Sequence, residues 1–314
     1  MRRFSTLTVF GGVSWDTVVT VPRFLSGDEK VWARVVGSYP GGMGANVAAA
    51  FAALGGQAAV VSAVGRDPAG ASSLDTLRRL KVDTSRVFQG PGSTFETLAM
   101  IDASGEKAML LLETPNLAGA GDLSIDEPRA GHDAIHIAPG RFSPAMADMT
   151  RWHRKGVHIS FDIEPSMLDQ GLDYRAHLEL ATVVFCGDTA SRAMSASSSP
   201  EQRARDLLRF GPEIAVLTRG RDGAMVAMRD GRLLERPGMA VVPVNTTGAG
   251  DVFAGAFLFG LSRMWPVELC LAAANLAAGR CVENYAAQDP AFDLSSIEAM
   301  PEFAAHFAKM QESS

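Results

Sequence analysis

The second half of the chain alternates between short apolar runs and longer amphipathic segments. Runs typical of buried strands occur at residues 134–138, 157–163, 182–185 and 214–218. Helical patterns lie between them, at residues 146–153, 176–180 and 203–210. Strands that alternate with helices predict a mostly parallel sheet with helices on both faces. We therefore expect an α/β fold.

The first half adds strands of two kinds. Residues 7–10 and 58–65 are continuous apolar runs that fit buried strands. Residues 94–101 and 107–112 instead flank Asp102-Ala103-Ser104-Gly105, a sequence typical of a hairpin turn. These two strands form either a small separate sheet or an extension at the edge of the main sheet.

Composition excludes several classes of protein. With 314 residues, 47% hydrophobic and 20% charged, the chain fits one large globular domain over residues 1–314. A formal net charge of −6 argues against a nucleic-acid partner, whose binding surface is normally basic. Cys186, Cys270 and Cys281 are widely spaced, which suits neither a zinc site nor a disulfide framework. We expect them to be reduced and buried.

The sequence also predicts no association with a membrane. No apolar run reaches the roughly 18–20 residues that a bilayer span needs. The apolar stretch near the N-terminus is short and interrupted by Gly11-Gly12, so it does not resemble a signal peptide. We expect a cytoplasmic protein.

Candidate chemistry concentrates at residues 245–253, Asn-Thr-Thr-Gly-Ala-Gly-Asp-Val-Phe. A strand-like run at 239–244 precedes this stretch and an apolar helical pattern at 254–261 follows it. A helix that begins after such a turn offers unpaired N–H groups and a dipole that attract a phosphate. No lysine follows the glycines, which excludes a Walker loop. Asp251 could instead remove a proton from an attacking hydroxyl, although a tight turn with an acidic first-turn residue also fits.

Several motifs together resemble the ribokinase, or PfkB-type, carbohydrate kinase family. Thr-Thr-Gly-Ala-Gly-Asp-x-Phe closely matches its C-terminal signature, and Gly-Gly-x-Gly-x-Asn at residues 41–46 matches its N-terminal one. A Val-Gly-x-Asp-x-x-Gly run at residues 64–70 is also similar. The resemblance extends from Gly11 to about Ala287. It implies a ribokinase-like fold and transfer of the ATP γ-phosphoryl group to a hydroxyl of a sugar or sugar-like molecule.

The resemblance also assigns roles at the catalytic centre. Gly248, Ala249 and Gly250 correspond to the backbone anion hole of the family, and Asp251 corresponds to its catalytic base. The stretches 14–40 and 92–113 would form a small β-sheet lid that closes over the acceptor. Closure excludes water, which is a competing phosphoryl acceptor.

Acceptor and nucleotide contacts follow by the same correspondence. Asp16 stands where the family grips sugar hydroxyls, and a carboxylate can accept two such hydrogen bonds; it could otherwise cap a turn. The remaining acceptor contacts implied are Gly41, Gly42, Asn46 and Asn116. The nucleotide contacts implied are Thr218, Gly220, Gly223 and Asn275. Arg219 and Arg221 either contact phosphate or are solvated, and Asn275 could equally be a packing residue of a helix.

The chain departs from the family pattern at three places. Asn245 replaces the usual Asp, which puts a contact with a monovalent cation such as K⁺ in doubt. The Asn-x-x-Glu motif that helps to place Mg²⁺ is absent at residues 186–189, leaving Asp188 and Glu164 as weak metal candidates. Pro139-Gly140 stands where relatives often carry a polar sugar ligand, so the acceptor specificity can differ from that of ribokinase.

The sequence thus predicts an ATP- and Mg²⁺-dependent sugar kinase, with K⁺ as a further candidate cofactor. One alternative is a nucleoside kinase of the same fold, in which Trp15 would stack on a base or serve in packing. Another is a binding protein without turnover, although Asp251 argues against it. A dehydrogenase is excluded because Gly-x-Gly-x-x-Gly is absent. Apolar lid strands make a homodimer through the lid plausible.

Overall fold

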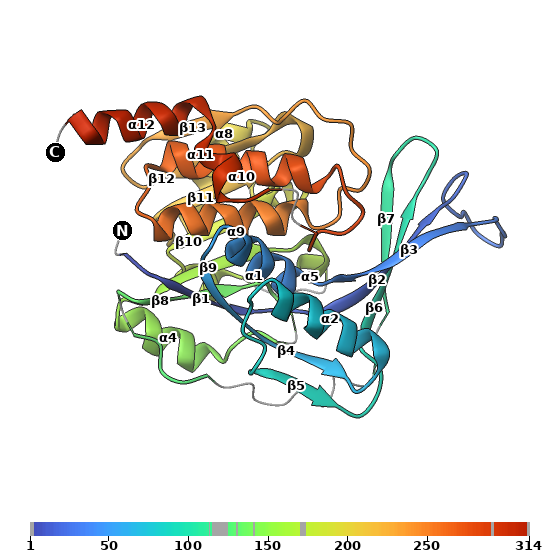
Figure 1. The fold of residues 1–314 in the computed structure, drawn as a ribbon. Coiled ribbons are helices and arrows are strands. Elements are labelled where there is room, and N and C mark those ends of the chain that lie inside the picture. The colour runs from blue at the N-terminus through green and yellow to red at the C-terminus, as the bar shows by residue number, and fades with distance from the viewer. Residues whose placement is uncertain are drawn as a thin grey trace.

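The computed structural model describes residues 3–112, 114, 125–129, 131–140, 142–169, 174–289 and 292–312. Within these residues the largest element is a sheet in the order β13-β12-β11-β10-β9-β8-β1-β4-β5 (Figure 1). Every neighbouring pair from β5 to β11 is parallel, and β12 and β13 continue the sheet antiparallel. The strands are β1 (Thr6–Phe10), β4 (Gln57–Gly65), β5 (Val87–Gly90), β8 (Asp133–Ile137), β9 (His158–Ile163), β10 (Val183–Gly187), β11 (Ile214–Thr218), β12 (Ala224–Met228) and β13 (Leu233–Arg236). The predicted mostly parallel sheet is confirmed.

Helices cover both faces of this sheet. Successive residues of a strand point to opposite faces, so neighbouring residues of β1 contact different helices. Val9 is buried on the face that carries α1, α9 and α10. Phe10 packs on the other face against Trp152 of α4, with ring centroids 6.0 Å apart. The first face is covered by α1 (Met43–Ala53), α2 (Pro68–Arg79), α9 (Ala249–Ser262), α10 (Val267–Cys281), α11 (Leu294–Glu298) and α12 (Pro301–Glu312). The second is covered by α4 (Met146–Arg154), α5 (Pro165–Asp169), α6 (Arg175–Leu178), α7 (Asp188–Met194) and α8 (Pro200–Leu208).

Small residues let α1 and α9 pack at close range. A Cβ atom at Gly255 of α9 would lie 2.5 Å from the carbonyl oxygen of Val47 and 2.8 Å from the Cβ of Ala50, both in α1. Gly44 likewise packs against Gly11 at the end of β1, where a Cβ would lie 2.7 Å from the backbone. This packing holds the two helices against each other and against the carboxyl end of β1.

A second, smaller sheet stands apart from the first (Figure 1). Its order is β3-β2-β6-β7, from β2 (Ser14–Thr20), β3 (Arg34–Gly41), β6 (Phe95–Ile101) and β7 (Lys107–Leu112). β2 and β6 are parallel, whereas β2–β3 and β6–β7 are antiparallel. The predicted hairpin around residues 102–105 joins β6 to β7. The small lid sheet is therefore confirmed, and it does not extend the main sheet.

The prediction of a strand at residues 239–244 was wrong. These residues have no regular secondary structure, although Val244 donates its N–H to the carbonyl oxygen of Val282. Val242 and Val244 are exposed, and Pro243 cannot donate to a neighbouring strand. The apolar pattern here belongs to an irregular segment that leads into α9.

Two negative expectations can be compared with the structure. Within the residues described, no helix is long and apolar enough to span a bilayer. The three cysteines are buried free thiols, as expected. Burial raises the pKa of Cys281 to about 12, so this side chain is a neutral thiol at physiological pH.

Candidate active site

Helix α9 begins at the Gly-Ala-Gly turn. Gly248 is its N-cap residue and has a φ of 79°, in the left-handed region that favours glycine. A Cβ there would lie 2.5 Å from the Cβ of Ala287 and 2.9 Å from Nδ2 of Asn46. By contrast, a Cβ at Gly250 would meet no heavy atom within 4 Å. The first turn of α9, which includes Ala249, therefore borders open space that an anion can enter.

Asp251 lies in the same turn and is half-buried. Its Oδ2 accepts a hydrogen bond of 2.8 Å from Nδ2 of Asn46. Burial raises the pKa of the Asp251 carboxyl well above its usual range, and the negative charges of Asp162 and Glu164 raise it further. The hydrogen bond from Asn46 and the charge of Lys107 act in the opposite direction. A carboxylate in this setting fits the role of a general base.

Asn46 comes from the first turn of α1, whose N-cap residue is Gly42. Gly42 has a φ of 99°, and a Cβ there would lie 2.4 Å from the carbonyl oxygen of Gly12. Asn46 is buried, and its Oδ1 accepts a hydrogen bond of 3.1 Å from Nε2 of Gln288. The fold thus brings Asn46 and Asp251 together although 205 residues separate them in the chain.

Asp16 lies within the lid strand β2, so it does not cap a turn. Its Oδ1 accepts hydrogen bonds from Oγ of Ser14 at 2.6 Å and from Oγ1 of Thr97 at 2.8 Å. A Cβ at Gly41 would lie 1.9 Å from Oδ2 of Asp16, so only glycine leaves room for this carboxylate. Burial raises the pKa of Asp16, while the two hydrogen bonds lower it. The carboxylate still has accepting capacity for a hydroxyl.

A narrow cleft separates the lid from the main body beside Asp16. It is lined by Asp16, Val18, Tyr39, Pro40 and Ala99 from the lid and by Asn245, Thr247, Tyr285, Ala286 and Ala287 from the body. The rings of Tyr39 and Tyr285 lie nearly parallel, with centroids 6.2 Å apart. Asn116, the remaining acceptor contact expected from the sequence, lies outside the described residues.

Lys107 is a charged residue of this region that the motifs did not indicate. It pairs with Ile101, which pairs with Thr20, so by strand alternation its side chain shares a face of the lid with Asp16. Burial lowers the pKa of Lys107, and the charges of Asp251 and Glu164 oppose this effect. The register of the β6–β7 hairpin is the sequence signal that could have placed Lys107 on the same face of the lid as Asp16.

The two metal candidates have different surroundings. Asp188 forms ion pairs with Arg192 and with the fully buried guanidinium of Arg203. Glu164 lies past the end of β9, where burial and then the charge of Asp162 raise its pKa to about 7. The described residues contain no group of three His, Cys, Asp or Glu able to hold a metal alone. Mg²⁺ usually needs only one or two carboxylates besides substrate phosphates, and Glu164 fits that requirement better than Asp188.

The expected nucleotide loop follows β11. Thr218 is the last residue of that strand, and Gly220 begins a short 3₁₀ turn (Gly220–Asp222). Nη2 of Arg219 pairs with Glu235 at 2.6 Å, whereas its buried Nε has no hydrogen-bond partner among the described residues. Arg221 is exposed.

Gly223 and Asn275 both support the segment that runs beside this loop. Gly223 has a φ of 83°, and a Cβ there would lie 2.0 Å from the carbonyl oxygen of Arg236. Asn275 projects from α10 and donates to the carbonyl oxygen of Pro237 at 2.9 Å. The four expected nucleotide residues thus lie around one loop, and Asn275 has a structural hydrogen bond of its own.

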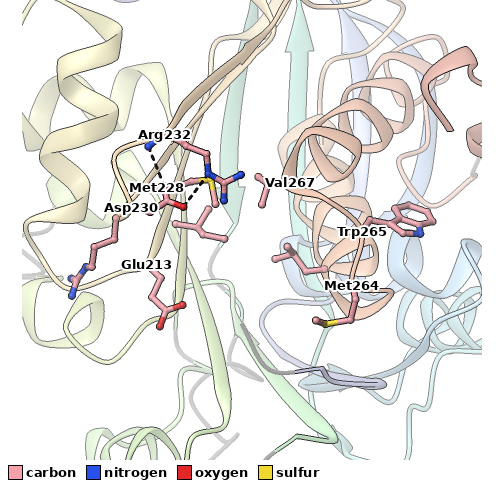
Figure 2. Close-up of a pocket in the computed structure, with 10 residues that line it drawn as sticks. Glu213, Met228, Asp230, Arg232, Met264, Trp265 and Val267 are labelled. Carbon is pink, nitrogen blue, oxygen red and sulfur yellow. Dashed lines mark hydrogen bonds and ion pairs between the residues drawn. The ribbon is translucent and has the colours of Figure 1, made fainter. Parts of the chain in front are cut away.

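A larger cavity of about 500 Å³ lies elsewhere, at the C-terminal end of α9 (Figure 2). It is lined by Glu213, Ile214, Met228, Arg229, Asp230, Arg232, Leu261, Met264, Trp265 and Val267. Arg232 is paired there with Asp230 and Glu268. None of the residues expected in the active site borders this cavity, so it is separate from the candidate active site.

The fold and the arrangement around Asp251 define a class of phosphotransferase, and comparison with known proteins agrees. Residues 5–293 match the pfkB family carbohydrate kinases, and the chain belongs to this family. It is 33% identical over 276 residues to the ATP-dependent ribose-1-phosphate kinase of Halopiger xanaduensis, covering 86% of this chain and 90% of that protein.

Two ribokinases are also similar to the chain. That of Bacillus subtilis is 26% identical over 287 residues, covering 90% of this chain and 94% of that one. The solved structure of ribokinase from Thermotoga maritima superposes with a TM-score of 0.78 at 21% identity. The match covers 94% of this chain and 99% of that one. The chain is therefore an ATP-dependent sugar or nucleoside kinase with an alcohol group as acceptor.

Gly41→Ala tests the contact between the glycine motif and Asp16. The added Cβ would displace the Asp16 carboxylate, and we expect the KM for the acceptor to rise about tenfold or more, because misplaced positioning groups cost rate steeply. The KM for ATP should stay unchanged, since the loop expected to hold the nucleotide lies elsewhere. Steady-state kinetics against both substrates measures this, and equal changes in both KM values would contradict it.

Proposed function

We propose that the chain transfers the γ-phosphoryl group of ATP to a hydroxyl of a sugar or sugar-like acceptor, with Asp251 as the general base. The observation that carries the proposal is the desolvated Asp251 carboxylate, which lies beside the open N-terminus of α9 and is held by Asn46 of the acceptor motif. Phosphoryl transfer to an alcohol requires a proton acceptor and, beside it, a site that stabilises the negative charge of the transferred group.

In the proposed reaction Asp16 accepts hydrogen bonds from acceptor hydroxyls across the cleft. The oxygen of one hydroxyl attacks the γ-phosphorus, its proton passes to Asp251, and ADP leaves. The N–H groups of Ala249 and Gly250 stabilise the charge of the transferring group. The loop from Thr218 to Gly223 holds the nucleotide, and lid closure excludes water.

Asp251→Asn tests the base. We expect kcat to fall about 10²–10⁴-fold, the range of general-base contributions, with ATP affinity little changed. Release of ADP from Mg²⁺-ATP would be measured with ribose, ribose 1-phosphate, fructose and cytidine as acceptors. Asp75→Asn on the exposed face of α2 is the matched control. Near-normal turnover of Asp251→Asn would contradict the proposal.

The same substitution has a predicted effect on stability. Folding raises the pKa of Asp251, so the folded state favours the protonated carboxyl and stability is lost as pH rises above the unfolded value of 3.8. Asp251→Asn should therefore melt at a higher temperature than the wild type at neutral pH, and the difference should shrink in acid. A lower melting temperature of the variant would contradict this sign.

We propose that Glu164 helps to hold the Mg²⁺ that accompanies ATP. This ion would neutralise negative charge on the phosphates. Glu164→Gln should raise the Mg²⁺ concentration for half-maximal velocity. Because burial raises the pKa of Glu164 to about 7, the effect should be large above that pH and small below it, where the wild-type carboxyl is itself protonated. Glu298→Gln on α11 serves as a control. An effect of equal size at both pH values would exclude this role.

We propose that turnover does not require K⁺. The amide of Asn245 donates Nδ2 to the carbonyl oxygen of Tyr285 at 2.9 Å and accepts the N–H of Thr247 at 3.0 Å. This neutral side chain joins the two loops through its own two hydrogen bonds. Replacing K⁺ by a bulky organic cation should leave wild-type kcat nearly unchanged, whereas Asn245→Asp should create a dependence on K⁺. Strong stimulation of the wild type by K⁺ would contradict the proposal.

We also propose a homodimer through the lid. Leu110 and Leu112 of the edge strand β7 and Trp32 beside β3 are exposed, and an exposed apolar edge strand favours pairing. Sedimentation velocity should show a dimer that Leu110→Glu converts to a monomer. A monomeric wild type at micromolar concentration would exclude it.

A further inference from the structure

Gln288 lies between α10 and α11 and is only 4% exposed. Its Nε2 donates to two acceptors, the carbonyl oxygen of Gly41 and Oδ1 of Asn46, each at 3.1 Å. Asn46 stands 242 residues earlier in the chain. The side chain therefore connects the C-terminal part of the chain to both ends of the glycine-rich acceptor motif.

These contacts fix the orientation of the Asn46 carboxamide, which has one accepting and one donating end. Because Gln288 donates to Oδ1, the Nδ2 end is directed to Asp251, whose Oδ2 accepts at 2.8 Å. The reversed orientation would place Oδ1 against the Asp251 carboxylate and Nδ2 against the donor of Gln288. Both contacts would then be unfavourable.

Gln288 itself has one favourable orientation. Its Nε2 uses a hydrogen on each of two acceptors, and turning the amide over would place Oε1 against two oxygens. Oε1 is buried and has no hydrogen-bond partner among the residues described. A buried unpaired acceptor weakens a fold. The buried amide is therefore better explained by its hydrogen bonds to Gly41 and Asn46 than by a contribution to the stability of the fold.

We propose that Gln288 is a positioning residue of the reaction: its amide orients Asn46, and Asn46 in turn keeps the Asp251 carboxylate available to the acceptor. The inference rests on the proposed role of Asp251 as base. Gln288 acts through Asn46 and not on the reacting atoms.

The groups around Asp251 determine whether its pKa rises or falls when the hydrogen bond from Asn46 is lost. The titratable groups that face it are Asp162, Glu164, Lys107 and Cys281. Burial and the two negative charges favour the protonated carboxyl, Lys107 favours the ionised form, and Cys281 is a neutral thiol. When Asn46 is free to turn, the hydrogen bond that opposes burial is lost. The pKa of Asp251 then rises, and less of the base is ionised at neutral pH.

The first test follows the carboxyl directly. The Asp251 signal would be titrated by carbon NMR in protein labelled at its aspartates, with Asp251→Asn as the assignment. We expect Gln288→Met to raise the pKa of Asp251 by about one pH unit, a tenfold change in proton affinity. Gln202→Met, which removes an exposed amide on α8, should leave it unchanged. An unchanged titration in Gln288→Met would overturn the proposal without reference to any acceptor.

A double-mutant cycle shows whether the effect passes through Asn46. Gln288→Met alone should lower kcat about tenfold and leave the KM for ATP unchanged, whereas in an Asn46→Ala background it should change kcat less than about twofold. Equal losses in the two backgrounds would mean that Gln288 does not act through Asn46.

Gln288→Glu keeps the size and polarity of the side chain and guards against simple loss of the fold. The neutral carboxyl can still donate to Asn46, but the ionised one cannot. The variant should therefore lose kcat, relative to the wild type, as pH rises through the pKa of the introduced carboxyl. A pH profile identical to the wild type would overturn the proposal. A wild type without turnover on every acceptor would contradict the kinase reaction, and the Asp251 titration would still decide the role of Gln288.

Discussion

The hydrogen bond between Asn46 and Asp251 joins the first turns of two buried helices, α1 and α9. Burial and neighbouring negative charge favour the protonated form of Asp251, and this hydrogen bond opposes them. The distance between Asn46 and Asp251 depends on how closely α1 and α9 pack. Gly255 permits close packing because it leaves room for the backbone of Val47. The close packing of α1 and α9 therefore supports the hydrogen bond that favours the ionised form of the proposed base.

The proposed acceptor contact, Asp16, and the proposed base, Asp251, belong to different parts of the fold. Asp16 is carried by the lid, whereas Asp251 is carried by the main body, and the charge of Lys107 in the lid acts on Asp251. The position of the lid therefore sets both the distance from Asp16 to Asp251 and the charge around Asp251. In the proposed reaction, a separate small sheet would close over the substrate without disturbing the packed helices of the main body.

The periodicity of the chain was sufficient to predict a mostly parallel α/β sheet, because buried parallel strands and amphipathic helices have distinct patterns, whereas the ribokinase-like fold and its lid followed from the resemblance of the motifs. Local motifs also placed the turn before α9. Contacts across the chain were not predictable: Gln288 meets Asn46 only in the folded protein, and the place of Lys107 depends on strand register. The apolar run at residues 239–244 misled because pattern alone does not show whether a neighbouring strand exists to pair with it.

The stereochemical course at phosphorus tests the central claim most directly. ATP whose γ-phosphoryl group is made chiral with oxygen isotopes would be turned over, and the configuration of the phosphorylated product determined. If Asp251 acts as a base, the acceptor oxygen displaces ADP in a single in-line step and the configuration inverts. Retention would mean two successive displacements through a phosphorylated enzyme, with a protein group as nucleophile, and would contradict the account.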